Sequence, residues 1–242
     1  MPLPDLSVVI PVCNEQDNVV PLAREIAAAL TGRRFEVLFV DDGSTDATVD
    51  AVRAARAEIP EVRLLRHSRR SGQSYAVASG VRAARAEWVA TLDGDGQNDP
   101  ADIPALVVAQ QGAGPNVRLV MGNRAANRRD TWLRRLQSRV ANGVRGGLLN
   151  DGTPDTGCGI KLMHRPTFLE LPFFNHMHRF MPALYQRHGA TVISVPVNHR
   201  PRLQGTSKYG LFNRLWVGIV DIFGVMWLQR RFAAGLSVSE EA

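Results

Sequence analysis

The sequence predicts an α/β fold built on a central, mainly parallel β-sheet. Short apolar runs rich in strand-forming residues alternate along the chain with stretches whose apolar residues recur at helical spacing. Three of these apolar runs are followed by acidic or amide residues, and parallel strands bind ligands at their carboxyl ends. The composition is that of a globular domain, with 45% hydrophobic and 21% charged residues, and 242 residues can bury a sizeable core.

Most of the regular elements are expected in the first half of the chain. Apolar runs predict strands over residues 6–12, 35–40, 62–65, 88–92 and 117–122, with a late strand over 191–197. Helices are predicted to begin at Asp17 or Asn18 and at Thr45 or Asp46, where these side chains can cap the first turn. Two further helices are predicted over 74–86 and 103–110.

The polar strand ends predict one site. They are Asn14-Glu15, Asp41-Asp42 and Asp93-Gly94-Asp95, and right-handed crossovers would bring them to one edge of the sheet. Paired carboxylates at such an edge suit Mg²⁺ or Mn²⁺ that carries a diphosphate. An acidic turn or a helix cap is the plainer interpretation of a single Asp-x-Asp. A phosphatase of the haloacid dehalogenase type is a further alternative, which Gln97 disfavours because Thr or Val is expected there.

The charge balance predicts an anionic partner. The net charge is +6 and the isoelectric point about 10.1, which fits nucleic acid, acidic lipid or a phosphorylated substrate. A basic nucleic-acid-binding protein would explain the charge, but acidic clusters at three strand ends would repel a phosphate backbone, so no nucleic-acid partner is expected. Lys161 and Lys208 are the only lysines in a chain rich in arginine.

The cysteine count and the lengths of the apolar runs indicate where in the cell the protein is expected. Two cysteines do not make a disulfide framework, no signal peptide is evident, and no apolar run reaches the roughly 20 residues that span a bilayer. The expectation is a cytoplasmic protein that is either soluble or peripheral on the inner face of the membrane.

Three motifs resemble those of glycosyltransferase family 2. They are Val-Ile-Pro-Val-Cys-Asn-Glu at 9–15, Val-Asp-Asp-Gly-Ser-Thr-Asp at 40–46 and Asp-Gly-Asp-Gly-Gln-Asn-Asp-Pro at 93–100. The resemblance runs from about Leu6 to Arg124 and implies the GT-A nucleotide-diphospho-sugar transferase fold, with C-terminal amphipathic helices. It implies nucleotide contacts from Pro11, Cys13 (where Tyr is common), Glu15, Val40, Asp42, Asp93, Gly94 and Arg124. It implies that Asp93, Asp95 and Gln97 surround the metal and the sugar.

The segment Asp151-Gly-Thr-Pro-Asp-Thr-Gly-Cys-Gly-Ile-Lys161 is rich in turn formers and ends in a predicted strand. It resembles the acceptor-side segment of polyprenyl-phosphate glycosyltransferases. The resemblance places Asp155 where related inverting enzymes have a catalytic carboxylate, although a polar turn is the alternative. Residues 198–210 resemble the acceptor loop of dolichol-phosphate mannose synthase relatives, which implies phosphate contacts from Arg200, Arg202 and Lys208, with Ser207 as a hydrogen-bond donor. His176 and His178 are expected to pack or to form hydrogen bonds rather than to bind metal.

Two segments combine aromatic and basic residues. Residues 128–149 fit either a solvated basic helix face or an interfacial membrane helix. The apolar stretch 211–232, with Trp216 and Trp227 and flanking arginines, fits a membrane-interface helix or a contact in a homo-oligomer. The expected organisation is a catalytic domain over 1–210, with a nucleotide-sugar and metal half (1–124) and an acceptor half (125–210), followed by an amphipathic tail over 211–242.

The resemblance implies an inverting, metal-dependent glycosyltransferase. It would move a sugar from GDP-mannose or a UDP-sugar to a polyprenyl phosphate at the cytoplasmic membrane face. A family member with a lipopolysaccharide or protein acceptor is the alternative. The residues expected to carry the reaction are Asp93, Asp95, Arg124, Asp155, Arg200, Arg202 and Lys208.

Overall fold

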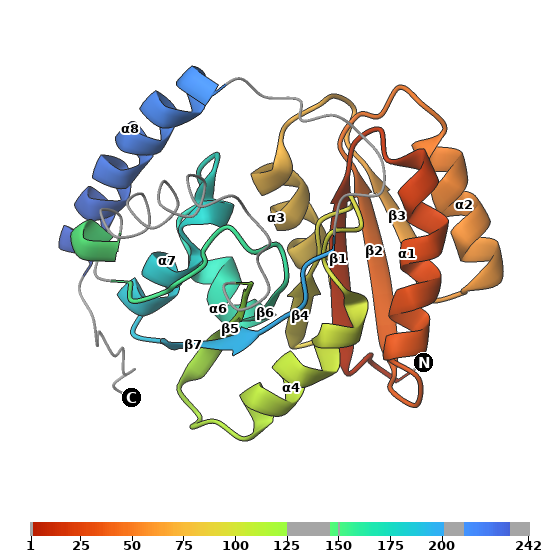
Figure 1. Cartoon of the computed structure of the whole chain (residues 1–242), viewed down its shortest axis with the longest axis horizontal. Helices are drawn as coiled ribbons and strands as arrows, with labels where there is room; N and C mark the ends of the chain where they lie inside the picture. The colour runs from red at the N-terminus through yellow and green to blue at the C-terminus, as the bar shows by residue number, and fades with distance from the viewer. Residues whose placement is uncertain (1, 125–145, 150, 201–210, 233–242) are drawn as a thin grey trace, which may run out of the picture.

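The structure, a computed structural model, describes residues 2–124, 146–149, 151–200 and 211–232 (Figure 1). The predicted basic segment 128–149 lies almost wholly outside these ranges. Arg202, Ser207 and Lys208 of the predicted acceptor loop also lie outside the described residues.

A seven-stranded sheet in the order β3-β2-β1-β4-β6-β5-β7 forms the centre of the described protein. All neighbouring strands are parallel except that β6 runs antiparallel to both β4 and β5. The predicted mainly parallel sheet is therefore confirmed. The strands are β1 (Leu6–Val12), β2 (Phe35–Asp41), β3 (Val62–Arg66), β4 (Trp88–Thr91), β5 (Val117–Asn123), β6 (Lys161–His164) and β7 (Thr191–Pro196).

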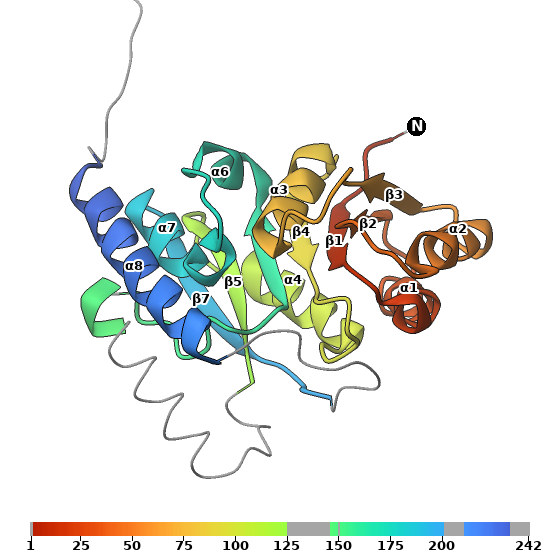
Figure 2. The same cartoon turned by 90° about the horizontal axis from the view of Figure 1, so that it is seen from above.

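Helices cover both faces of this sheet (Figure 2). They are α1 (Gln16–Ala29), α2 (Thr48–Glu58), α3 (Gln73–Ala83), α4 (Ile103–Gln111), α6 (Arg165–Glu170), α7 (Met181–Arg187) and α8 (Leu211–Arg230), with 3₁₀ turns η1 (Pro100–Asp102) and η2 (Met177–Arg179). None of the helices in the described ranges is both long and apolar enough to cross a membrane.

The alternation of buried side chains along the strands produces two cores. On β1, Val8 and Ile10 face the core that α1, α2 and α4 complete. Val9 faces the opposite core, which α3, α6 and α7 complete and to which α8 contributes the fully buried Val225. The central strands are thus apolar on both sides, as expected for a covered parallel sheet.

Helix starts differ from the prediction by a few residues. The first helix begins at Gln16, after Glu15, rather than at Asp17 or Asn18. The second begins at Thr48, two residues after Asp46, whose Oδ1 accepts a hydrogen bond from the first N–H of the helix, Thr48 N (3.0 Å), and whose Oδ2 accepts from Gln16 N (3.4 Å). Asp46 therefore joins the end of β1 to the end of β2.

The direction of β6 positions part of the site. In the antiparallel register, Lys161 pairs with Thr91 of β4 and with Met121 of β5. The first residue of β6 therefore lies level with the carboxyl ends of its neighbours, where β1, β2 and β4 deliver their polar residues. A parallel β6 would have placed its first residue at the opposite edge.

Candidate active site

The polar ends of β1 and β2 are bonded to each other. Asn14, in the left-handed region with φ 56°, donates its backbone N–H to Ser44 Oγ (2.9 Å) and accepts at Oδ1 from Thr45 N (2.8 Å). Glu15 N donates to Thr48 Oγ1 (2.8 Å). The sequence prediction that these strand ends gather at one edge is thus confirmed in the structure.

Asp41 and Asp42 are both buried but have different surroundings. Asp42 accepts hydrogen bonds from Ser71 N (2.8 Å) and Gly72 N (2.7 Å), and His67 Nδ1 lies 2.8 Å from the same carboxylate. Asp41 Oδ1 accepts from Ser44 N (3.1 Å), whereas its Oδ2 is buried and makes no hydrogen bond within the described residues. Of the four carboxylate oxygens, only Asp41 Oδ2 lacks a hydrogen bond within the described residues, and Arg66 Nε lies 3.9 Å from it.

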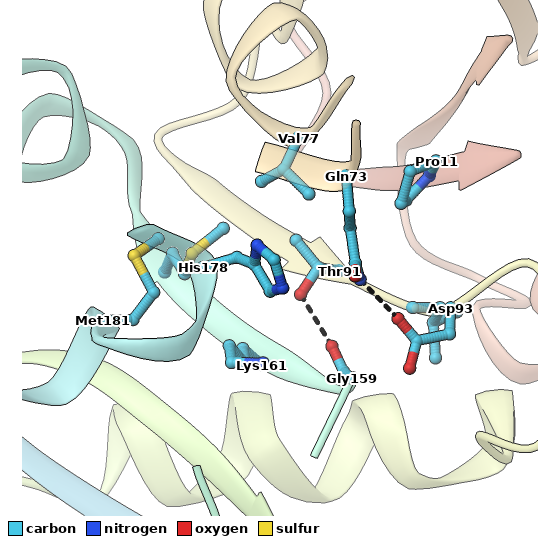
Figure 3. A pocket seen from close by; sticks show the side chains of 11 residues that line it. Pro11, Gln73, Val77, Thr91, Asp93, Gly159, Lys161, His178 and Met181 are labelled. Atoms are coloured by element: carbon cyan, nitrogen blue, oxygen red, sulfur yellow. Dashed lines mark hydrogen bonds between the residues drawn. The ribbon is translucent and has the colours of Figure 1, made fainter. Parts of the chain in front are cut away.

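Asp93 lies at the end of β4, beside a small pocket (Figure 3). Its Oδ1 accepts a hydrogen bond from Gln73 Nε2 (2.8 Å), and its backbone N–H donates to Asn98 Oδ1 (3.0 Å). Burial raises the pKa of Asp93, and the neighbouring charge of Asp95 adds to this rise, whereas Lys161 and Arg124 oppose it. Two carboxylates are thus held close together at a partly enclosed edge.

A glycine on the opposite segment makes room for this carboxylate. A Cβ added to Gly159 would lie 2.2 Å from Asp93 Oδ2 and 2.4 Å from Asn98 Oδ1. Both oxygens belong to side chains that hydrogen bonds hold in place, so neither can move aside cheaply. Position 159 therefore requires glycine if Asp93 is to keep its orientation.

Asp93 and Asp95 fit a divalent cation. Mg²⁺ commonly binds through one or two carboxylates and takes its other oxygen ligands from phosphates and water. No group of three or more His, Cys, Asp or Glu side chains suited to a metal occurs in the described part of the chain. A cation here would therefore depend on the diphosphate of a substrate, and it would offset the repulsion between the two carboxylates.

Lys161 and His178 line the same pocket from β6 and η2. Lys161 is only 7% exposed, and its Nζ donates a hydrogen bond to the Cys158 carbonyl oxygen. His178 Nδ1 lies 2.7 Å from Ser74 Oγ, and burial lowers the pKa of His178 to about 3, with the charge of Lys161 acting in the same direction. The imidazole is therefore neutral at physiological pH.

Arg124 and Asp155 form a bidentate ion pair. Arg124 Nε donates to Asp155 Oδ2 (2.8 Å), its second guanidinium nitrogen donates to Oδ1 (2.9 Å), and its backbone N–H also reaches Oδ2 (3.2 Å). The side chains are 13% and 8% exposed. Burial tends to lower the pKa of Arg124, but the hydrogen bonds with Asp155 raise it above its usual value. Asp155 thus anchors Arg124 beside the site.

Comparison with known proteins gives the family. The sequence model described as Glycosyl transferase family 2 matches residues 7–171. The chain belongs to glycosyltransferase family 2. It is 35% identical over 231 residues to a dodecaprenyl-phosphate galacturonate synthase of Rhizobium johnstonii, covering 93% of this chain and 68% of that protein. It is 35% identical over 211 residues to an undecaprenyl-phosphate 4-deoxy-4-formamido-L-arabinose transferase of Edwardsiella ictaluri, covering 85% and 63%.

Solved structures confirm the GT-A fold of this glycosyltransferase. A glucosyl-3-phosphoglycerate synthase from Mycobacterium tuberculosis, in complex with Mn²⁺ and UDP, superposes with a TM-score of 0.71 at 18% identity over 93% of this chain and 80% of that one. A mannosyltransferase from Pyrobaculum calidifontis, in complex with GDP-Man and Mn²⁺, superposes with a TM-score of 0.65 at 18% identity, covering 95% and 65%. The chain spans only about two thirds of the curated relatives named above.

The residues predicted to contact the nucleotide differ in how exposed they are in this glycosyltransferase. Pro11 lines the pocket, and Cys13 and Glu15 are partly exposed at the end of β1. Val40 is fully buried and packs in the second core, so its side chain has no open face toward a ligand. Gly94 lies against Pro11 O, since an added Cβ would be 2.9 Å away. Their nucleotide contacts stay predictions.

The predicted phosphate-binding Arg200 is held by carboxylates. Its guanidinium lies 2.6 Å from Glu25 Oε2 and 2.7 Å from Asp99 Oδ1, and its backbone N–H donates to Gln97 O (3.0 Å). Arg200 therefore ties the segment after β7 to the loop of the proposed metal ligands. A direct phosphate contact from Arg200 stays a prediction, and would need this arrangement to change.

Sequence reasoning did not assign Lys161 or His178 to the site. A mild signal existed for Lys161, because it is one of only two lysines in an arginine-rich chain. Nothing in the pattern around His178 indicated a pocket. Its position depends on η2 packing against α3, which places His178 beside Ser74.

Proposed function

We propose that this chain transfers a sugar from a nucleotide diphosphate sugar to a polyprenyl phosphate, with inversion at the anomeric carbon. The observation that carries the proposal is the similarity, across most of the chain, to two enzymes whose names specify polyprenyl-phosphate acceptors. The paired carboxylates Asp93 and Asp95 at the end of β4 supply the donor side. These relatives handle different sugars, so the sugar does not follow from them.

The reaction needs positioning more than proton transfer. A phosphate oxygen of the acceptor attacks the anomeric carbon, and the bond from that carbon to the diphosphate oxygen breaks with its electron pair leaving on the nucleoside diphosphate. Attack from the face opposite the leaving group inverts the configuration. The acceptor phosphate is already anionic at neutral pH, so a general base is not required. Asp155, ion-paired with Arg124, then serves chiefly to orient that arginine.

Charge on the departing diphosphate is the main obstacle. Asp93 and Asp95, with Gln97, would hold Mg²⁺ or Mn²⁺, and the bound cation would supply Lewis-acid stabilisation of the leaving group. Arg124 adds a second positive charge at the same edge. Arg200 holds the end of the described range 151–200 beside Gln97. Arg202 and Lys208, which lie outside the described residues, would then contact the acceptor phosphate.

The helix α8 is proposed to attach the enzyme to the membrane that holds its acceptor. Ile219, Val220, Phe223 and Trp227 are exposed along one face of α8, by 36%, 65%, 63% and 59%. The opposite face packs against α7 through Val225. Apolar and aromatic side chains flanked by arginine suit the boundary between lipid headgroups and acyl chains. A contact between two copies of the chain is the competing use of this face.

The test is a transfer assay with a short-chain polyprenyl phosphate and a panel of UDP- and GDP-sugars, with and without Mg²⁺ or Mn²⁺. The expected result is a lipid-phosphate sugar from one donor series, only in the presence of metal. Transfer to lipopolysaccharide or protein acceptors, with none to the polyprenyl phosphate, would overturn the proposed acceptor. Absence of nucleotide binding would overturn the donor side as well.

A further inference from the structure

The pocket beside Asp93 contains a buried positive charge with unused hydrogen-bonding capacity. It is lined by eleven residues, of which Lys161 is the only cation and Asp93 the only anion. An ammonium group has three N–H donors, and Lys161 Nζ uses one on the Cys158 carbonyl oxygen. No other hydrogen bond of Nζ occurs within the described residues. The remaining donors are thus available to a ligand in the pocket.

The other pocket residues do not balance the charge of Lys161 once the donor and its cation are bound. Burial lowers the pKa of Lys161, and Asp93 is the carboxylate whose charge opposes this lowering most strongly. In the proposed function, however, Asp93 binds the cation that carries the diphosphate, so its charge is shared with that cation. Arg124 already has Asp155 as its partner. A buried ammonium whose counter-charge is withdrawn is costly unless another anion approaches.

The surroundings favour a strong interaction with such an anion. Val77 and Met181 give the pocket an apolar wall, and His178 contributes a neutral imidazole rather than a second charge (Figure 3). Met163 also lines the pocket. Hydrogen bonds between charged partners are stronger where water is excluded. The pocket borders the carboxylate edge, which in the proposed function holds the sugar attached to the diphosphate.

We propose that this pocket selects donor sugars that carry a carboxylate, and that Lys161 is the residue that recognises it. The inference rests on the proposed function and narrows its donor to nucleotide hexuronates. A neutral hexose could offer only a hydroxyl, which accepts a hydrogen bond from Lys161 but does not replace the withdrawn counter-charge. Lys161 is therefore a specificity-determining residue rather than a general requirement of the fold.

Binding measurements by calorimetry in the presence of Mn²⁺ test this directly. The matched ligands are UDP-glucuronate against UDP-glucose, UDP-galacturonate against UDP-galactose, and GDP-mannuronate against GDP-mannose. In the series whose base is bound, the wild-type protein should prefer the hexuronate by roughly ten- to hundred-fold, as expected for a charge-assisted contact. Lys161→Gln, which keeps an N–H donor without the charge, should reduce the preference below about three-fold. His178→Gln, a neutral change in the same pocket, should retain it.

Two results would overturn the inference. One is a wild-type protein that binds hexuronate and hexose equally, and the other is a Lys161→Gln protein that keeps the full preference. If Lys161→Gln does not fold, Lys161→Met takes its place, because the wild-type comparison alone decides only whether hexuronates are preferred. Binding of UDP and GDP, which carry no sugar, distinguishes failure of this inference from failure of the proposed function. Nucleoside diphosphate binding with no hexuronate preference removes only the inference, whereas failure to bind any nucleotide removes the donor side of the proposed function.

Discussion

Breaking the Arg124–Asp155 pair tests whether Asp155 acts as an anchor or as a catalytic base. The perturbations are Arg124→Met, Asp155→Asn and the two together. In the structure each oxygen of Asp155 accepts a hydrogen bond from the Arg124 side chain, at 2.8 and 2.9 Å. Both side chains are largely buried, so water cannot replace the missing partner at low cost.

The size of the effect follows from that burial. Removing one partner of a buried ion pair typically costs about 3–5 kcal/mol, because the other charge is left without compensation. Arg124→Met should therefore lower the free energy of unfolding by about 3–5 kcal/mol, and Asp155→Asn by somewhat less, since its amide oxygen can still accept one hydrogen bond. The double variant should cost clearly less than the sum, because neither charge remains to be buried alone.

Urea unfolding of the four proteins gives the cycle, and transfer assays on the same preparations give the second readout. If Asp155 is an anchor, its effect on turnover should depend on Arg124, so that Asp155→Asn adds little to the loss already caused by Arg124→Met. Additive stability effects would refute the structural coupling. A full additional loss of turnover from Asp155→Asn in the Arg124→Met background would indicate a chemical role for the carboxylate.

Four further outcomes are expected. Asp95→Asn should nearly abolish turnover with little change in the unfolding midpoint, and excess EDTA should do the same to the wild type; normal activity in either case contradicts a metal role. Gly159→Ala should weaken Mn²⁺-dependent nucleotide binding, measured by calorimetry, because the new Cβ must displace the Asp93 carboxylate. Because the pKa of His178 is lowered to about 3 in the folded protein, its contribution to stability is present above the ordinary value near 6.5 and is lost as pH falls toward 3. His178→Gln should therefore make urea stability less steep over that range, and an unchanged slope would contradict this. The protein should cosediment with anionic liposomes, less so at high salt, and Trp227→Ser should weaken this binding. If the protein instead stays in the supernatant and forms dimers, the exposed face of α8 is a subunit contact.

The fold could be predicted because its signals are local. Apolar runs such as Leu6–Val12 and Phe35–Asp41 are long enough to identify buried strands, and the polar residues that follow each of them fix which edge carries the site. Element boundaries were less accurate, since Asp46 lies two residues before the helix, where it accepts a hydrogen bond from Thr48 N at the helix start and another from Gln16 N of α1. A single sequence does not show that one aspartate makes both of these contacts.

Lys161 shows why the site itself was only partly predictable. Its place in the pocket depends on β6 running antiparallel between β4 and β5, and strand direction follows from the path of the chain through the preceding residues rather than from the strand's own composition. Arg124 was predicted to contact the leaving diphosphate, and Asp155 was predicted to be a catalytic carboxylate on the acceptor side. The predictions for these two residues were made separately. Their pairing joins residues 31 apart in sequence, and the resemblance that suggested each role contained no information on that contact.

The adjacent pair Asp41-Asp42 makes the same point within two residues. A family motif assigns a role to a sequence position, whereas the chemistry depends on which carboxylate oxygens already accept hydrogen bonds. Asp42 is at a position expected to contact the nucleotide, yet it receives two backbone N–H groups from the loop before α3, at 2.8 and 2.7 Å, and His67 also contacts it. It thereby fixes the start of α3 and, through Gln73, the orientation of Asp93. Asp41 Oδ2 makes no hydrogen bond within the described residues, but it is buried and lies 3.9 Å from Arg66 Nε, so it is not open to a polar group of the donor.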